Sequence, residues 1–129
     1  MATINRYEDI LGWQKARELT NFVYNLTRQD SFARDYGLKD QIQRATVSIM
    51  SNIAEGFGRD SNRDFIQFLS ISKASTNEVR SQLYVALDQK YITPDQFDQG
   101  YQLCKETIHT IGGFIAYLKK SPLKGSKYK

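Results

Sequence analysis

Residues 51–65, SNIAEGFGRDSNRDF, concentrate residue types that can bind phosphate or take part in catalysis. The segment carries two glycines one residue apart, a glutamate within an apolar stretch and two arginines. A dinucleotide-binding loop needs Gly-x-Gly-x-x-Gly after a strand, and a Walker loop needs Gly-Lys followed by Ser or Thr. The run Gly56-Phe57-Gly58 has neither spacing and follows a helical pattern. The spacing therefore disfavours a phosphate-binding loop and favours a corner between two helices.

The same segment has the residues that end one helix and begin the next. Gly56 directly follows a long apolar stripe, where helices often end in a left-handed glycine, and Gly58 adds freedom to the turn. Ser61 or Asn62 is suited to cap the following helix, because short polar side chains accept hydrogen bonds from its first N–H groups. We therefore expect a helix–turn–helix corner.

Asn52, Glu55 and Arg59 form a second pattern at this corner. Asn52 falls on the apolar stripe, which favours a buried or half-buried amide that satisfies loop backbone groups. Glu55 lies in the last turn of the helix, where the helix dipole disfavours an acid, so we expect it to have a cationic partner. Arg59, four residues on, is the natural candidate. We predict an ion-pair or amide network among these three residues.

One Glu-x-x-His pair raises the question of a metal site. Di-iron and di-manganese sites in helical bundles use two such pairs and two further glutamates. Glu106-x-x-His109 is the one pair with this spacing, and His109 is the single histidine of the chain. Cys104 lies on an apolar stripe, where a free cysteine behaves as a small apolar residue. The sequence therefore predicts no metal, no cofactor, no small-molecule substrate, and a protein that is not an enzyme.

Length and composition indicate one globular domain. The chain has 129 residues, of which 40% are hydrophobic and 25% charged, and its formal net charge is +4. A chain of this size can bury one core without disulfides or metals, and its single cysteine excludes an internal disulfide. No stretch approaches the roughly 20 apolar residues of a membrane span, and the first residues lack the apolar core of a signal peptide. We expect a cytoplasmic protein with no membrane partner.

Apolar residues recur at steps of three and four in four long segments, which is the period of amphipathic helices. The last segment begins at Thr93 and Pro94, which suit the N-cap and the first turn, and it ends at Ser121-Pro122. The others run from about residue 7 to 28, 37 to 55 and 62 to 91. The inward positions are, in chain order, Trp13, Ala16, Leu19, Val23 and Leu26; Leu38, Ile42, Ala45, Ile49, Asn52 and Ile53; Phe65, Leu69, Ser72, Thr76, Val79, Leu83 and Ala86; and Phe97, Tyr101, Cys104, Ile108, Ile111, Ile115 and Leu118.

These segments predict an all-α fold, an antiparallel up-down-up-down four-helix bundle with left-handed coiled-coil-like packing. Small polar residues in the middle of the third stripe, Ser72, Ser75 and Thr76, let a neighbouring helix come close. Their hydroxyls can bond back to the preceding turn, so their burial need not leave them unpaired. We expect the bundle to occupy residues 1–121 and a basic, flexible tail to occupy residues 122–129.

Three stretches carry a family resemblance: WQKARELTNFVYNLT, YGLKDQIQRATVSIMSNIAEGFGR and FIQFLSISKASTNEVRSQL. From about residue 7 to 118, the chain resembles the bacterial four-helix-bundle proteins encoded in intervening sequences of 23S ribosomal RNA genes. It departs from that pattern at Met50, where the family usually has proline, and at Arg80, where it often has a second glutamate. The matching residues are Trp13, Gln41, Arg44, Ser48, Asn52, Ile53, Ala54, Glu55, Gly56, Gly58, Arg59 and Glu78.

The resemblance implies a ring-like homopentamer of helical bundles, in a family without an established biochemical activity. It extends distantly to the accessory protein of diversity-generating retroelements, which works with a reverse transcriptase and its RNA. The expected partners are therefore further copies of the chain, and RNA or an RNA-handling enzyme.

The distribution of basic residues favours RNA association through one end of the bundle. In an up-down-up-down order, the corner after the second helix and the end of the fourth helix lie at the same end. Phe57 and Tyr128 are aromatic residues there that can stack on bases. The candidate RNA-binding residues are Arg59, Arg63, Lys119, Lys120, Lys124, Lys127 and Lys129.

A protein-interaction scaffold without nucleic-acid binding is the alternative. Tyr24, Tyr84, Tyr91 and Tyr117 fall off the predicted core stripes. Exposed aromatic residues are enriched at protein–protein interfaces. A homo-oligomer is compatible with both functions.

Overall fold

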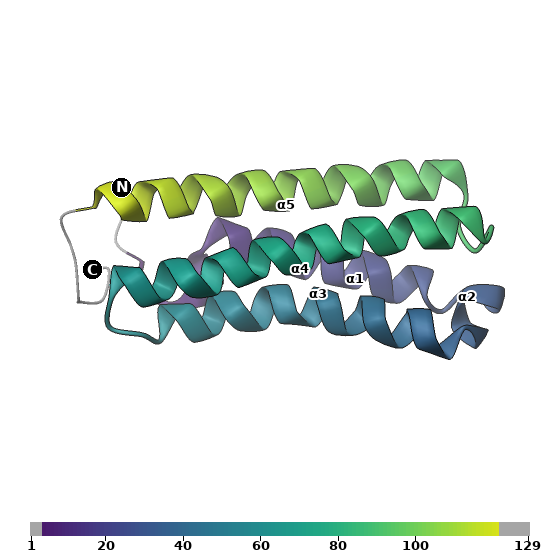
Figure 1. The fold of residues 1–129 in the computed structure, drawn as a ribbon, viewed down its shortest axis with the longest axis horizontal. Coiled ribbons are helices and arrows are strands. Elements are labelled where there is room, and N and C mark those ends of the chain that lie inside the picture. The colour runs from purple at the N-terminus through teal and green to yellow at the C-terminus, as the bar shows by residue number, and fades with distance from the viewer. Residues whose placement is uncertain (1–3, 122–129) are drawn as a thin grey trace.

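Residues 4–121 are described by a computed structural model, and every regular element within them is a helix. The elements are η1 (Tyr7–Asp9), α1 (Leu11–Leu26), α2 (Asp30–Arg34), α3 (Tyr36–Phe57), α4 (Asn62–Asp88) and α5 (Pro94–Lys120). The long helices α1, α3, α4 and α5 lie side by side, and α2 lies at the end where α1 connects to α3 (Figure 1). Helices α3 and α5 each pack on both α1 and α4. No helix in this part of the chain is long and apolar enough to cross a membrane.

Side-chain caps begin α4 and α5 where the sequence predicts them. The Ser61 hydroxyl accepts a hydrogen bond from the backbone N–H of Asp64 at 3.1 Å. At α5, the Thr93 hydroxyl accepts from the N–H of Gln96, and the Gln96 side chain accepts from the N–H of Thr93, which completes a capping box. Pro94 occupies the first turn, where a missing N–H is tolerated.

Helix α4 ends at Asp88, earlier than the pattern suggests, because Lys90 adopts a left-handed conformation with φ of 64°. The N–H of Lys90 donates to the Leu87 carbonyl and the N–H of Tyr91 donates to the Ala86 carbonyl, both at 2.9 Å. These two bonds form a Schellman motif, in which glycine is the usual left-handed residue.

The first predicted helix and its connection to the second differ from expectation. Ile10 is extended, with φ of −77° and ψ of 123°, so the expected helix from residue 7 divides into η1 and α1. The segment between the first two expected helices contains α2, whose Phe32 is fully buried. Phe32 stacks on Tyr91 with ring centroids 5.4 Å apart. Burial of this ring explains why a short helix forms there.

The predicted core of α4 is correct at every position, and that of α5 is shifted in its first half. All seven inward residues of the third stripe are buried. In α5, Phe97, Tyr101 and Ile108 are half-buried, whereas Gly100 and Thr107 are buried. A Cβ on Gly100 would lie 2.9 Å from Leu83 Cδ1. Because α4 comes close to α5 at this glycine, the rings of Phe97 and Tyr101 lie at the edge of the core and not inside it.

Helices α3 and α4 approach each other through small polar side chains. The Ser72 hydroxyl donates to the Ile49 carbonyl oxygen of α3 at 2.9 Å, and the hydroxyls of Ser48 and Ser75 lie 3.0 Å apart. Thr76 bonds back to the Ser72 carbonyl within α4. The predicted close approach is therefore present, although Ser72 bonds across the helices and not to its own preceding turn.

Gly56 has a different role from the one that the sequence suggests. Helix α3 continues through it to Phe57, and none of the glycines within residues 4–121 has a left-handed φ. Gly56 is buried, and a Cβ there would lie 2.8 Å from both Phe65 Cδ1 and Phe68 Cβ. The prediction of a left-handed helix end was wrong, because this glycine is needed for the packing of α4 onto α3.

Gly56→Ala should lower the free energy of unfolding by about 1–3 kcal/mol, because the added methyl overpacks the contact with Phe65 and Phe68. Gly113→Ala is the matched control. Apart from its own stretch of helix, no described atom lies within 4 Å of a Cβ at Gly113 in the interior of α5, so alanine should raise the free energy of unfolding by about 1 kcal/mol through helix propensity. Urea unfolding measures both. Changes of the same sign would contradict this role for Gly56.

Candidate nucleic-acid interface

The corner between α3 and α4 contains part of the predicted polar network. Arg59 Nη2 lies 3.1 Å from Glu55 Oε2, and the Arg59 guanidinium lies 4.9 Å from the centroid of the Phe68 ring. Asn52 is half-buried as expected, but its Nδ2 donates to the carbonyl oxygen and hydroxyl of Ser48. Asn52 therefore bonds within α3, to the serine whose hydroxyl lies 3.0 Å from that of Ser75 in α4, and not to the Glu55–Arg59 pair.

Two of the predicted cations, Arg63 and Lys119, line one hollow where the start of α4 meets the end of α5. The hollow has a volume of about 460 Å³, and Ile66 and Leu118 contribute apolar surface to it. Asn62 holds the two helix ends together, because its Nδ2 donates to the Leu118 carbonyl oxygen at 3.0 Å. The sequence thus correctly placed Arg63 and Lys119 at one end of the helices.

The remaining predicted cations divide into two groups. Lys120 is exposed in the last turn of α5, beside Lys119. Lys124, Lys127 and Lys129 lie outside the described residues, as does Tyr128.

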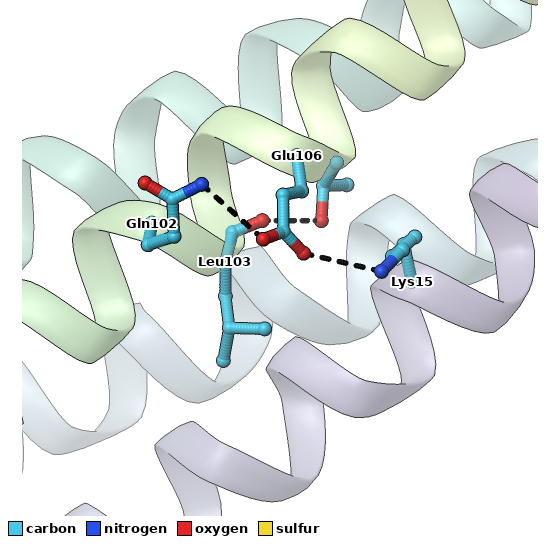
Figure 2. Close-up of polar contacts among 5 residues, drawn as sticks. Lys15, Gln102, Leu103 and Glu106 are labelled. Atoms are coloured by element: carbon cyan, nitrogen blue, oxygen red, sulfur yellow. Dashed lines mark hydrogen bonds and ion pairs between the residues drawn. The ribbon is translucent and has the colours of Figure 1, made fainter.

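The Glu106 carboxylate is engaged by a lysine and an amide (Figure 2). Lys15 Nζ of α1 donates to Glu106 Oε1 at 3.1 Å, and Gln102 Nε2 donates to Oε2 at 3.2 Å. These hydrogen bonds and the charge of Lys15 lower the pKa of Glu106, and the carboxylate in turn raises the pKa of Lys15. His109 is exposed, and residues 4–121 contain no group of three His, Cys, Asp or Glu side chains placed to hold a metal ion.

Cys104 is buried in the core. Desolvation raises the pKa of its thiol to about 12, against a smaller opposing effect of the Arg80 charge. At neutral pH the group is a thiol, which is a poor nucleophile. This environment fits the expected packing role.

An aromatic cluster with one arginine, unrecognised in the sequence, lies between α4 and the first turns of α5. The Tyr84 ring is 4.8 Å from Phe97 and 6.3 Å from Tyr101, between centroids. The Arg80 guanidinium lies 4.8 Å from the centroid of Tyr101, and its Nη2 donates to the Tyr101 hydroxyl at 3.2 Å. The pattern places Arg80 and Tyr84 one turn apart on α4, but it does not place α5 beside them.

Comparison with known proteins identifies the family. Residues 8–113 match the sequence model of the family described as 23S rRNA-intervening sequence protein. The chain belongs to this family. The match covers the corner and most of α5, and stops short of Lys119 and Lys120.

A solved structure resembles this 23S rRNA-intervening sequence protein in fold. It is a protein of unknown function from the S23 ribosomal protein family of Bacteroides thetaiotaomicron VPI-5482. The two chains are 24% identical with a TM-score of 0.76, over 82% of this chain and 96% of the other. No curated protein matches the sequence. The structural likeness establishes a shared fold.

Glu106→Gln should make stability less sensitive to acid. Because the folded pKa of Glu106 is lowered, its contribution to stability is present above the ordinary glutamate pKa and is lost as the pH falls through the lowered value. The variant should melt slightly below the unchanged protein at neutral pH, and the gap in Tm should close in acid. The effect is small because both side chains are more than a third exposed.

Thermal unfolding followed by circular dichroism across a pH series measures this gap. Glu78→Gln is the control, since Glu78 is an exposed glutamate of α4 outside this network. A gap for Glu106→Gln that stays constant down to strongly acidic pH would show that the Lys15 contact does not stabilise the fold.

Proposed function

We propose that this 23S rRNA-intervening sequence protein is a non-catalytic, self-assembling accessory protein that binds RNA. The observation that carries the proposal is the meeting of Arg63 and Lys119 at one hollow. Neither side chain is within ion-pair distance of a carboxylate among residues 4–121. Two cations held together without an internal anion favour an external one, and the phosphate backbone is the anion that dominates nucleic-acid affinity.

The arrangement of the helices in this proposal is the antiparallel up-down-up-down bundle with left-handed packing. Two contacts between helix ends support this order. Asn62 at the start of α4 bonds Leu118 at the end of α5. The Tyr91 hydroxyl, just after α4, donates to Asp35 Oδ2 at the start of α3 at 2.9 Å. In this order the cations of the α3–α4 corner and of the α5 end reinforce one another.

The RNA would be held by charge and not by a chemical step, with no cofactor and in the cytoplasm. The partner is RNA itself or an enzyme already bound to RNA. In an oligomer each copy repeats the cationic end, and release of counterions from several copies would strengthen binding.

The double variant Lys119→Gln/Lys120→Gln should weaken RNA binding and flatten its salt dependence. For single-stranded RNA, the slope of log affinity against log salt should be less steep by about 1.4, because each lost phosphate contact removes about 0.7. Fluorescence polarisation across a salt series measures this slope. If the double variant is also ended at Ser121, it loses Lys124, Lys127 and Lys129 as well. Its salt dependence should then be flatter still.

Arg34→Gln/Lys39→Gln is the matched control, because it removes two positive charges near the α2–α3 junction, away from the α4–α5 hollow. It should leave the slope nearly unchanged. Absence of RNA binding by the unchanged protein at low salt would overturn the proposed function and leave the scaffold alternative.

Self-assembly is the second part of the proposal, with a homopentamer as the expected state. Val47 of α3 and Ile71 and Val85 of α4 are 43%, 48% and 43% exposed. Branched apolar side chains exposed on neighbouring helices gain from burial against another copy. We propose that α3 and α4 supply the contact between subunits.

Ile71→Lys should reduce the assembly to smaller species, because a buried unpaired charge opposes association. Native mass spectrometry should give the mass of five chains for the unchanged protein and of fewer chains for the variant. Leu11→Lys is the control, since Leu11 is 67% exposed on α1. A monomer at every concentration of the unchanged protein would refute the pentamer.

A further inference from the structure

Six side chains define a strip along the outer faces of α4 and α5, here called the α4–α5 strip. They are Arg63, Lys73, Arg80 and Tyr84 of α4, and Tyr101 and Lys119 of α5. On α4, steps of three and four residues lead from Arg63 through Ile66, Ser70, Lys73, Asn77 and Arg80 to Tyr84. Residues at this spacing share one helix face. The strip from residue 63 to 84 is about 31 Å long at the rise of an α-helix.

Contacts at three levels place α5 beside this face of α4. Arg63 and Lys119 line one hollow at the first level. At the second, Lys73 Nζ lies 3.9 Å from the Cβ position of Gly112. At the third, Arg80 contacts Tyr101 by a hydrogen bond and over the ring. The cations are therefore distributed along one continuous seam.

The cations of the α4–α5 strip lack anionic partners within the described residues. None of Arg63, Lys73, Arg80 and Lys119 forms an ion pair with a carboxylate there. The stepped face of α4 carries no acid between Arg63 and Tyr84, and Asp88 follows only one turn beyond. This charge pattern is complementary to a linear polyanion.

Tyr84 gives the strip a flat surface at its other end. The residue is 48% exposed, while the rings of Phe97 and Tyr101 contact its ring from α5. The Arg80 guanidinium over Tyr101 lies one turn away. An aromatic ring that is held in place but still exposed is the type of surface on which unpaired bases stack.

We infer that the α4–α5 strip binds single-stranded RNA lengthwise, with a base stacked on Tyr84 and phosphates contacting Arg80, Lys73 and the Arg63–Lys119 hollow. The inference rests on the proposed RNA binding and adds the surface and the strandedness of the ligand. A duplex keeps its bases stacked inside, so it can use the cations but not the tyrosine. The strip therefore favours single strands.

The test compares a labelled single-stranded RNA of mixed sequence with the same RNA annealed to its complement. Fluorescence polarisation follows binding to the full chain across a salt series. Tyr84→Ala should weaken single-strand binding by at least about fivefold, the lower end for loss of one base stack. Duplex binding should change little. Tyr84→Phe keeps the ring and should bind like the unchanged protein, which separates stacking from loss of the hydroxyl.

Arg80→Gln should reduce the single-strand salt slope by about 0.7, as expected for one phosphate contact. Two matched controls lie on other helices. Arg17 also lies over an aromatic ring, 5.8 Å from the centroid of Trp13 on α1, and Tyr36 on α3 is 75% exposed. Arg17→Gln and Tyr36→Ala should leave both the affinity and the slope unchanged. Unfolding curves establish that each variant is folded.

Three outcomes separate the two proposals. Loss of single-strand binding in Tyr84→Ala, rescue in Tyr84→Phe and a flatter slope in Arg80→Gln would support the strip. RNA binding that weakens in Lys119→Gln/Lys120→Gln but not in the Tyr84 or Arg80 variants would overturn the strip and keep the proposed function. No RNA binding by the unchanged protein would overturn both.

Discussion

The hydrogen bond from the Ser72 hydroxyl to the Ile49 carbonyl oxygen determines how α3 and α4 lie against each other. A serine hydroxyl reaches the backbone of a neighbouring helix only where the two helices are very close. Ser48, Asn52 and Ser75 extend this polar contact, and buried Gly56 continues the close approach to the corner. Each bond adds only about 1 kcal/mol, but larger side chains at these positions would force the helices apart. This contact sets the position of α4, on which the proposed surfaces depend.

With one face of α4 held against α3, its other faces have distinct surroundings. The core face carries the buried apolar stripe. The side toward α5 carries Lys73, Arg80 and Tyr84, and contacts α5 through Tyr101 and through the Arg63–Lys119 hollow. Because the helix is rigid, the cations keep a constant spacing along it. The residues proposed to meet RNA therefore lie on the side of α4 toward α5 and are distinct from its buried apolar stripe.

The sequence predicts the parts of this arrangement that depend on period and on capping. Every inward residue of α4 and the caps at Ser61 and Thr93 could be derived, because they follow from spacing and from local hydrogen bonds. The role of Gly56 could not, because its contacts come from Phe65 and Phe68 after the corner. The partner of Asn52 was missed for a different reason: its amide bonds to Ser48 one turn earlier in α3, whereas the prediction paired it with residues later in the chain.

The candidate site, like the fold, has some features that the sequence predicts and others that it does not. Charge and helix order placed Arg63 and Lys119 at one end, and five of the seven predicted cations lie in the last turn of α5 or follow it in the sequence. The cluster of Arg80, Tyr84 and Tyr101 escaped prediction because it exists only when two helices are aligned in register. A pattern along one helix does not carry that information.

The most direct measurement is chemical-shift mapping by NMR of the isotope-labelled protein titrated with single-stranded RNA. If α4 and α5 together form the RNA-binding surface, the shifted backbone and side-chain signals should run along the outer faces of these two helices, from Arg63 and Lys119 to Arg80 and Tyr84. The signals of α1 and of the α3 face away from α4 should stay in place. Shifts confined to α1 and α3, or scattered evenly over the surface, would contradict the account.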